Sequence, residues 1–197
     1  MATAVKTECT VHEHADPRVR RTRKLLQDAF RTLIHKNRFS DISVQDITEE
    51  AGVNRATFYA HYVDKSDLGI SVARTDLATS VMKMFAQRPD FTRDNLITFS
   101  VGVFDFIGGF HNGCPKAAAD LHGSLSMGIE EELCDLVKTW LTHSKAYLRI
   151  FPGSRPETVA SVISSSIYGA ANRWARTSTR EPAEDVCREI VGVLLKE

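Results

Sequence analysis

The chain has 197 residues, of which 43% are hydrophobic and 25% are charged, and its 25 Lys and Arg residues balance 25 Asp and Glu residues. This is the composition of an ordinary globular protein, and no apolar run approaches the roughly 20 residues of a membrane span. The cysteines, Cys9, Cys114, Cys134 and Cys187, lack paired short spacing, which argues against a disulfide framework or a structural zinc site. The first residues carry no secretory leader pattern, so we expect a cytoplasmic chain with no membrane partner.

The zero net charge hides an uneven distribution along the chain. Residues 17–40 hold eight basic side chains and one acidic side chain, Asp28, which is a local net charge of +7. A basic stretch of this kind can neutralise phosphates even on a neutral molecule. The other interpretation of the stretch is a solvated helix surface.

The N-terminal part predicts a flexible arm followed by a helix. Residues 1–15 are short of large apolar side chains, and we expect them to form a mobile arm. Asp16 and Pro17 are typical of an N-cap and a first helical position, and apolar residues at helical spacing continue to about Lys36.

Two short helices are predicted next. Ser43 with Asp46 indicates a capping-box start for the first of them, and Gly52 suits its left-handed C-terminal turn. Asn54 is a good N-cap for the second. Two short helices joined by a turn that contains glycine predict a helix-turn-helix motif.

The second of these helices, from Arg55 to about Tyr62, carries the argument for function. Phe58 and Tyr62 are four residues apart, share a face and are expected to pack inward. The remaining face is polar and basic without a core purpose, and it holds Arg55, Thr57, Tyr59 and His61. Arginine can bond both acceptors of a guanine in the DNA major groove, and hydroxyl and imidazole groups can donate to phosphates.

This stretch resembles the TetR family of transcriptional regulators over residues 17–68, about a quarter of the chain. The matching motifs are the turn Ala51-Gly52-Val53, the core Thr57-Phe58-Tyr59-Ala60-His61-Tyr62 and the following Lys65-Ser66-Asp67-Leu68. Tyr62 stands where phenylalanine is usual. The resemblance implies that the chain binds double-stranded DNA. Arg55 and Thr57 would contact bases or adjacent phosphates, Tyr59 and His61 the DNA backbone, and Lys65 a phosphate. At the edges, Ser43 and Gln45 would contact the flanking strand, and a phosphate or the minor groove would be contacted by Arg18, Arg20 and Arg21.

The rest of the chain also predicts helices, so we expect an all-α protein. Residues 16–63 would form a three-helix DNA-binding domain, and residues 64–197 a larger domain for effector binding and dimerisation. Asp64 predicts the cap of a long fourth helix. Gly108-Gly109 predicts an interruption of a later helix, and Ser154 with Glu157 predicts a capping box around Pro156.

The C-terminal domain suggests a pocket and an interface. Aromatic and histidine side chains are candidates for an effector pocket, which is typically apolar with few polar anchors: Phe104, Phe110, His111, His122, Trp140, His143, Tyr147, Tyr168 and Trp174. The last two helices have broad apolar or small surfaces, and the resemblance implies that they form a homodimer interface. Its candidate residues are Ser161, Ser165, Gly169, Ile190, Val191 and Leu194.

The leading hypothesis is a dimeric repressor that binds a pseudo-palindromic operator and is released by a small, largely apolar effector. One alternative is a DNA-binding activator, and another is a redox- or metal-responsive regulator that uses Cys114, His111 and His122. A small helical enzyme is a distant alternative, because no catalytic motif is present. We predict no catalytic residues, no cofactor and no metal site.

Overall fold

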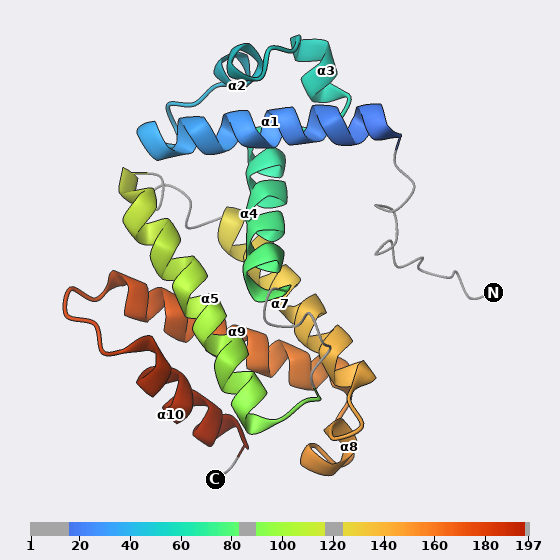
Figure 1. The fold of residues 1–197 in the computed structure, drawn as a ribbon, viewed down its shortest axis with the longest axis vertical. Coiled ribbons are helices and arrows are strands. Elements are labelled where there is room, and N and C mark those ends of the chain that lie inside the picture. Colours follow the sequence, from blue (N-terminus) through green and yellow to red (C-terminus); the bar gives the residue numbers. More distant parts are fainter. Residues whose placement is uncertain (1–15, 83–89, 117–123, 196–197) are drawn as a thin grey trace.

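The computed structural model describes residues 16–82, 90–116 and 124–195, and the regular elements in these ranges are all helices. The all-α prediction is therefore confirmed, while the expected arm of residues 1–15 lies outside the described residues. No described helix has the length and apolar run that a bilayer crossing needs. Figure 1 shows the elements α1 (Pro17–Lys36), α2 (Val44–Ala51), α3 (Arg55–Tyr59), α4 (Lys65–Met82), α5 (Arg93–Gly113), α7 (Ser124–His143), α8 (Tyr147–Ile150), α9 (Pro156–Arg176) and α10 (Ala183–Leu195).

The first helix forms as its sequence predicts. The Asp16 carboxylate accepts a hydrogen bond from the Arg18 amide, and Pro17 occupies the first turn, where it has no helical hydrogen bond to lose. The buried side of α1 presents Leu26, Phe30 and Ile34. This apolar stripe is the surface on which the other N-terminal helices assemble.

Helices α1, α2 and α3 form a head that is seated on the end of α4 (Figure 1). The apolar core of the head includes Phe30, Ile47 and Phe58, and it extends into α4 through Leu68 and Val72. Helix α4 therefore contributes to the core of the head as well as to the core of the body. This shared helix couples the two parts mechanically.

The body consists of α5, α7, α8, α9 and α10 with the distal part of α4. Helix α9 packs against α7 and α5, and α10 packs on α5 (Figure 1). A Cβ atom at Gly128 would lie 2.5 Å from Ile70 Cγ2, so the absence of a side chain there lets α7 approach α4 closely. Aromatic residues fill the core, where Phe91 and Phe99 contact Trp140 and Phe104 contacts Trp174.

Two local expectations for the body are wrong. Helix α5 continues through Gly108 and Gly109 to Gly113. Gly108 allows close packing against α9, because a Cβ atom there would lie 2.8 Å from the Trp174 ring. The predicted capping box around Pro156 does not form, since α9 begins at Pro156 and its N-cap is Arg155. Ser154 thus lies one residue too early to cap the helix.

Candidate nucleic-acid interface and internal cavity

The turn between α2 and α3 is built by local capping. Ser43 Oγ accepts from the Asp46 amide, and the Asp46 carboxylate accepts from the Ser43 amide at 2.8 Å, which confirms the capping box. The hydrogen bond from the Ser43 hydroxyl also lowers the pKa of Asp46 below its ordinary value. Gly52 ends α2 with φ at 65°, a left-handed conformation that a side chain would strain.

Helix α3 is oriented by its buried aromatic side. Asn54 caps the helix, as predicted, by accepting from the Thr57 amide at 2.8 Å. Phe58 is fully buried, and Tyr62, just beyond the helix, is also buried, so the inward-facing prediction is confirmed. The helix ends at Tyr59 rather than near Tyr62, because the last turn tightens as the His61 amide donates to the Phe58 carbonyl.

The opposite side of α3 faces outward with a basic and aromatic surface. Tyr59 is 52% exposed and Arg55 is exposed, and an Arg55 Nη2 to Tyr59 hydroxyl contact of 3.4 Å holds the two side chains together. Thr57 and His61 are half-buried beside them, and the Thr57 hydroxyl donates to Asn54 Oδ1. The structure thus brings Arg55 and Tyr59 together, while no hydrogen bond joins them to Thr57 or His61 among the described residues.

The other predicted contact residues lie at the edges of this surface. Ser43 and Gln45 are exposed, and their side chains bond within α2, Ser43 to Asp46 and Gln45 to Glu49. Arg18, Arg20 and Arg21 are exposed on the first turns of α1. The sequence-based list does not contain Arg23, whose guanidinium lies 5.2 Å from the centre of the Tyr62 ring and whose Nε is buried without a hydrogen-bond partner.

The Lys65 side chain is engaged within the chain. Its ammonium donates to three backbone carbonyls of the loop that follows α1, those of Phe39 at 2.9 Å, Ser40 at 3.2 Å and Ile42 at 2.7 Å. It also lies 4.7 Å from the centre of the Phe39 ring. An ammonium has three donors, so none remains for a phosphate. In this structure Lys65 therefore ties the start of α4 to the loop before α2, and its contact with a phosphate stays a prediction.

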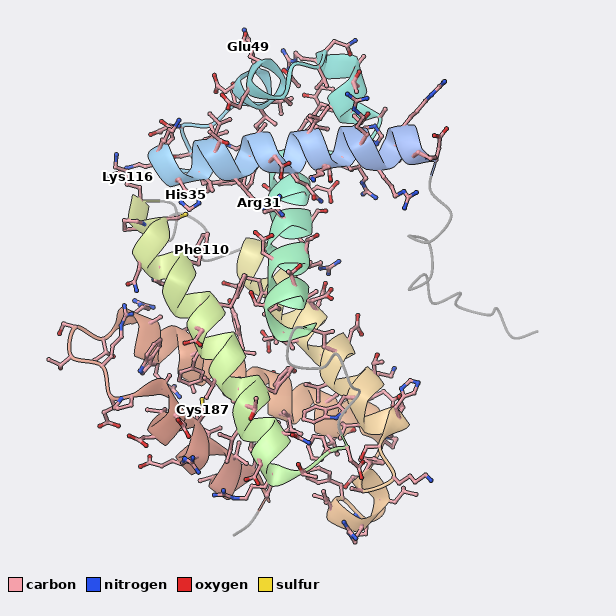
Figure 2. The ribbon with its side chains drawn as sticks, viewed as in Figure 1. Arg31, His35, Glu49, Phe110, Lys116 and Cys187 are labelled. Atoms are coloured by element: carbon pink, nitrogen blue, oxygen red, sulfur yellow. The ribbon has the colours of Figure 1, made fainter. Side chains whose placement is uncertain are left out.

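A cavity of about 380 Å³ lies where the head meets the body. Its wall combines residues of α1, α4, α5, α7 and α9. Most of the lining is apolar, and the side chains with rings or charges are Phe30, Arg31, His35, Asp76, Asp105, Phe106, Phe110, His111 and Tyr168. Figure 2 shows Arg31, His35 and Phe110 at this junction.

Only part of the predicted pocket lines this cavity. Phe110, His111 and Tyr168 do, whereas a second group of predicted residues belongs to the packed core of the body, namely Phe104, Trp140, Tyr147 and Trp174. These rings pack against one another and against neighbouring helices, so they do not line this cavity, and a role for them in effector binding stays a prediction. His143 is exposed at the end of α7, and its Nδ1 lies 2.7 Å from the Thr139 carbonyl. His122 lies outside the described residues.

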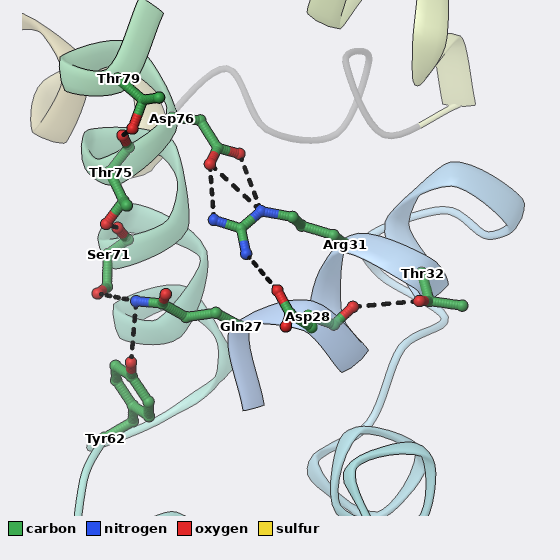
Figure 3. Close-up of polar contacts among 9 residues, drawn as sticks. All are labelled: Gln27, Asp28, Arg31, Thr32, Tyr62, Ser71, Thr75, Asp76 and Thr79. Atoms are coloured by element: carbon green, nitrogen blue, oxygen red, sulfur yellow. Dashed lines mark hydrogen bonds and ion pairs between the residues drawn. The ribbon is translucent and has the colours of Figure 1, made fainter. Parts of the chain in front are cut away.

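One ion pair ties α1 to α4 beside the cavity. Arg31 Nη2 lies 2.6 Å from Asp76 Oδ1, and Arg31 Nε lies 3.2 Å from both oxygens of the same carboxylate (Figure 3). Arg31 also bonds Asp28 within α1 at 2.9 Å. A second link runs from Gln27 Nε2 to Ser71 Oγ at 3.2 Å. Any shift of α4 relative to α1 must stretch these contacts.

The two buried thiols, Cys114 and Cys187, are poor candidates for redox chemistry. Burial raises the pKa of the Cys114 thiol and raises that of Cys187 to about 12, so both stay protonated at neutral pH. Cys114 Sγ lies 3.2 Å from His35 Nδ1, a contact between the ends of α5 and α1. Among the residues that the structure describes, no group of three His, Cys, Asp or Glu side chains converges to hold a metal ion.

The last two helices expose apolar and small residues. On α9, Ser161 and Ser165 are exposed, Val162 is 54% exposed, and nothing lies within 4 Å of the position of a Cβ atom at Gly169. On α10, Val193 is 81% exposed, and Ile190 and Leu194 are half-buried. Val191 is fully buried in the core of its own chain. It is therefore removed from the predicted interface.

Comparison with known sequences finds a family profile that matches the head and the start of α4. The profile of the family described as "Bacterial regulatory proteins, tetR family" matches residues 26–72. An HTH-type transcriptional regulator of Bacillus subtilis, YxbF, is 42% identical over 66 residues. This alignment covers 33% of the present chain and 17% of the length of that relative.

Solved structures match nearly the whole fold at low identity. The TetR family repressor AlkX from Dietzia sp. superposes with a TM-score of 0.61 at 18% identity, covering 88% of this chain and 93% of that one. FadR from Bacillus subtilis, in complex with stearoyl-CoA, gives 0.59 at 17% identity, covering 87% and 97%. RolR in complex with resorcinol gives 0.63 at 15% identity, covering 91% and 88%. These likenesses establish a shared fold.

Proposed function

We propose that the chain is a transcriptional regulator of the tetR family, a family of DNA-binding transcription factors rather than enzymes, because the profile of that family matches residues 26–72. We further propose that it is a dimeric repressor released by a small, largely apolar effector. The observation that carries this proposal is the cavity of about 380 Å³ directly beneath α1. The cavity is lined by residues of both the head and the body, so a ligand there can contact both. A bacterial regulator of this kind acts in the cytoplasm, on double-stranded DNA.

The outward side of α3 is the proposed base-reading surface. Arg55 reaches base edges in the major groove, where a guanidinium can bond both acceptors of a guanine. Thr57, Tyr59 and His61 supply hydroxyl and imidazole groups for the backbone and for neighbouring bases. The exposed arginines on the first turns of α1 add sequence-independent attraction to phosphates.

Release follows from the position of the cavity. An effector lowers DNA affinity only by binding more tightly to the state in which the reading helices are misplaced. The cavity is lined by Phe30 and Ile34 of α1 and by Val72 and Ala73 of α4, so a ligand there contacts both sides of the junction. The volume lies within the about 300–1,000 Å³ of small-molecule sites, and the RolR complex holds an aromatic ligand, resorcinol, on a shared fold.

The proposed operator has two half-sites because we propose a homodimer through α9 and α10. The supporting surface consists of the exposed Ser161, Val162 and Ser165 and the half-buried Gly169, where small side chains allow another helix to approach. Val193 extends this apolar surface onto α10. A two-fold dimer matches a pseudo-palindrome with half-site centres roughly 34 Å apart.

The dimer proposal predicts that Val162→Lys weakens self-association at least tenfold. A two-fold axis places two new charges in one interface, and their desolvation opposes association. Sedimentation velocity over a concentration series measures the effect, with the 22.0 kDa chain as the monomer reference. Leu148→Lys is the matched control, because Leu148 is 72% exposed on α8. A parent chain that stays monomeric, or a variant that dimerises like the parent, contradicts the proposal.

The function itself is tested by selecting DNA from a random library with the purified chain and measuring binding to the enriched sequence. We expect an inverted repeat, protected from cleavage across two half-sites, and affinity above that for unrelated DNA by about 10³-fold or more. An intact and dimeric protein that enriches no sequence would refute DNA-directed regulation. Transcription from a promoter that carries the enriched site separates repression from activation.

A further inference from the structure

The cavity at the junction of head and body carries an excess of negative charge. Its charged lining residues are Asp76, Asp105 and Arg31, and Arg31 is already bonded to Asp76 and to Asp28. Asp105 of α5 forms no ion pair with any residue in the part of the chain that the structure describes. The carboxylate of Asp105 is therefore available to a charged ligand, while the guanidinium is not.

The apolar part of the same wall is unusually aromatic. Phe30 of α1, Phe106 and Phe110 of α5, and Tyr168 of α9 all line the cavity. The faces of aromatic rings attract cations, and rings that surround a cavity are the usual means by which proteins hold ammonium groups. The charge of the lining and the chemistry of its walls thus favour the same kind of ligand.

We propose that this cavity binds an organic cation, an ammonium compound with an aromatic or alkyl body. The positive charge is held by the Asp105 carboxylate, and the body contacts the aromatic rings. This inference rests on the proposed effector cavity and adds the charge of the ligand that the cavity selects. An anionic ligand would be repelled by the carboxylates of Asp105 and Asp76. The guanidinium of Arg31 could not offset this repulsion, because it is already held in a bidentate ion pair.

The same chemistry connects the ligand to the head. Arg31 binds Asp76 across the junction of α1 and α4, and Asp76 lines the same cavity as Asp105, so a cation held by Asp105 would also attract the carboxylate of Asp76 in competition with Arg31. Competition weakens a contact that fixes α1 to α4. The Arg31–Asp76 ion pair thus connects the charge of the ligand to the position of the DNA-binding head.

Three probes with one phenylbutyl body test the proposal: phenylbutyl-trimethylammonium, phenylbutanol and phenylbutyrate. Their head groups are positive, neutral and negative, and calorimetric titration of the full chain measures their dissociation constants. We expect the ammonium compound to bind at least tenfold more tightly than the alcohol, and the carboxylate to bind most weakly. Equal affinities, tighter binding of the carboxylate, or no binding of the ammonium compound would overturn the proposal.

Two variants test whether Asp105 is the residue that binds the positive charge. Asp105→Asn removes the charge at an exposed position and is expected to reduce the preference for the ammonium probe to within threefold of the alcohol. Asp94→Asn is the matched control, because Asp94 is an exposed carboxylate on the same helix, eleven residues or about 16 Å away along α5. An Asp105→Asn chain that keeps the full preference contradicts the assignment to Asp105.

The test of the cation proposal can fail independently of the test of the proposed function. Binding to the selected operator is measured without any probe, so failure to recognise DNA refutes the regulator and leaves the cation preference to be read from calorimetry. A chain that recognises its operator and has no preference for the ammonium probe refutes the cation proposal alone.

Discussion

Replacing Lys65 with alanine is expected to lower the free energy of unfolding by about 2–4 kcal/mol, since hydrogen bonds to charged groups contribute about 1.5–3 kcal/mol each and do not add fully. The substitution removes an ammonium that donates to the carbonyls of Phe39, Ser40 and Ile42. It leaves these acceptors without their partner and releases the loop that precedes α2. Urea unfolding of the full chain, followed by circular dichroism, measures the loss.

This result distinguishes a structural lysine from a phosphate-binding one. Lys24→Ala is the control, because Lys24 is an exposed lysine of α1 and its loss should change stability by less than about 0.5 kcal/mol. If Lys65→Ala unfolded like the parent and instead reduced the salt dependence of DNA binding, Lys65 would be a phosphate contact after all. That outcome would require the lysine to leave its three carbonyls in the DNA complex.

Replacing Arg55 with alanine is expected to weaken binding to the selected operator by about 1–3 kcal/mol, the usual value of a bidentate contact to a base. Arg55 is exposed on α3 and is oriented by its contact with the Tyr59 hydroxyl. Binding to unrelated DNA should fall much less, and specificity should relax at one base position of each half-site. Fluorescence anisotropy with operator and scrambled duplexes at one salt concentration measures both effects.

The controls for Arg55 separate charge from base recognition. Arg149→Ala removes an exposed arginine from α8 and should leave operator binding unchanged. Arg55→Lys keeps the charge without the planar fork and should recover little of the specificity. An equal loss on operator and scrambled DNA would identify Arg55 as a phosphate contact, and no loss on either would remove it from the interface.

The head was largely predictable because its decisive interactions are local. The Ser43–Asp46 capping box and the Asn54–Thr57 cap both join residues three positions apart. A side chain and a backbone group at that separation meet whenever the helix forms, whatever the rest of the chain does. The inward side of α3 was predictable for the same reason, because Phe58 and Tyr62 share one face.

The residues that line the cavity were less predictable, because an aromatic side chain in a helical protein can either line a cavity or pack in the core. Phe110 and Tyr168 line the cavity, while Trp140 and Trp174 are packed into the core, and nothing in the local sequence separates the two pairs. Burial of Val191 likewise depends on how α10 seats on the rest of the body. Composition alone therefore could not distinguish a wall residue from a core residue.

The sequence by itself determined the all-α class, the helix-turn-helix and the buried side of α3, since these follow from interactions within a few residues and from a short family motif. Only the tertiary structure decided which groups meet across the junction of head and body. Lys65 binds a carbonyl 26 residues away, Arg31 binds Asp76 at a separation of 45, and Cys114 contacts His35 at a separation of 79. Contacts of this length depend on how whole helices pack, so their partners, and the charge of the cavity between them, are properties of the assembled fold.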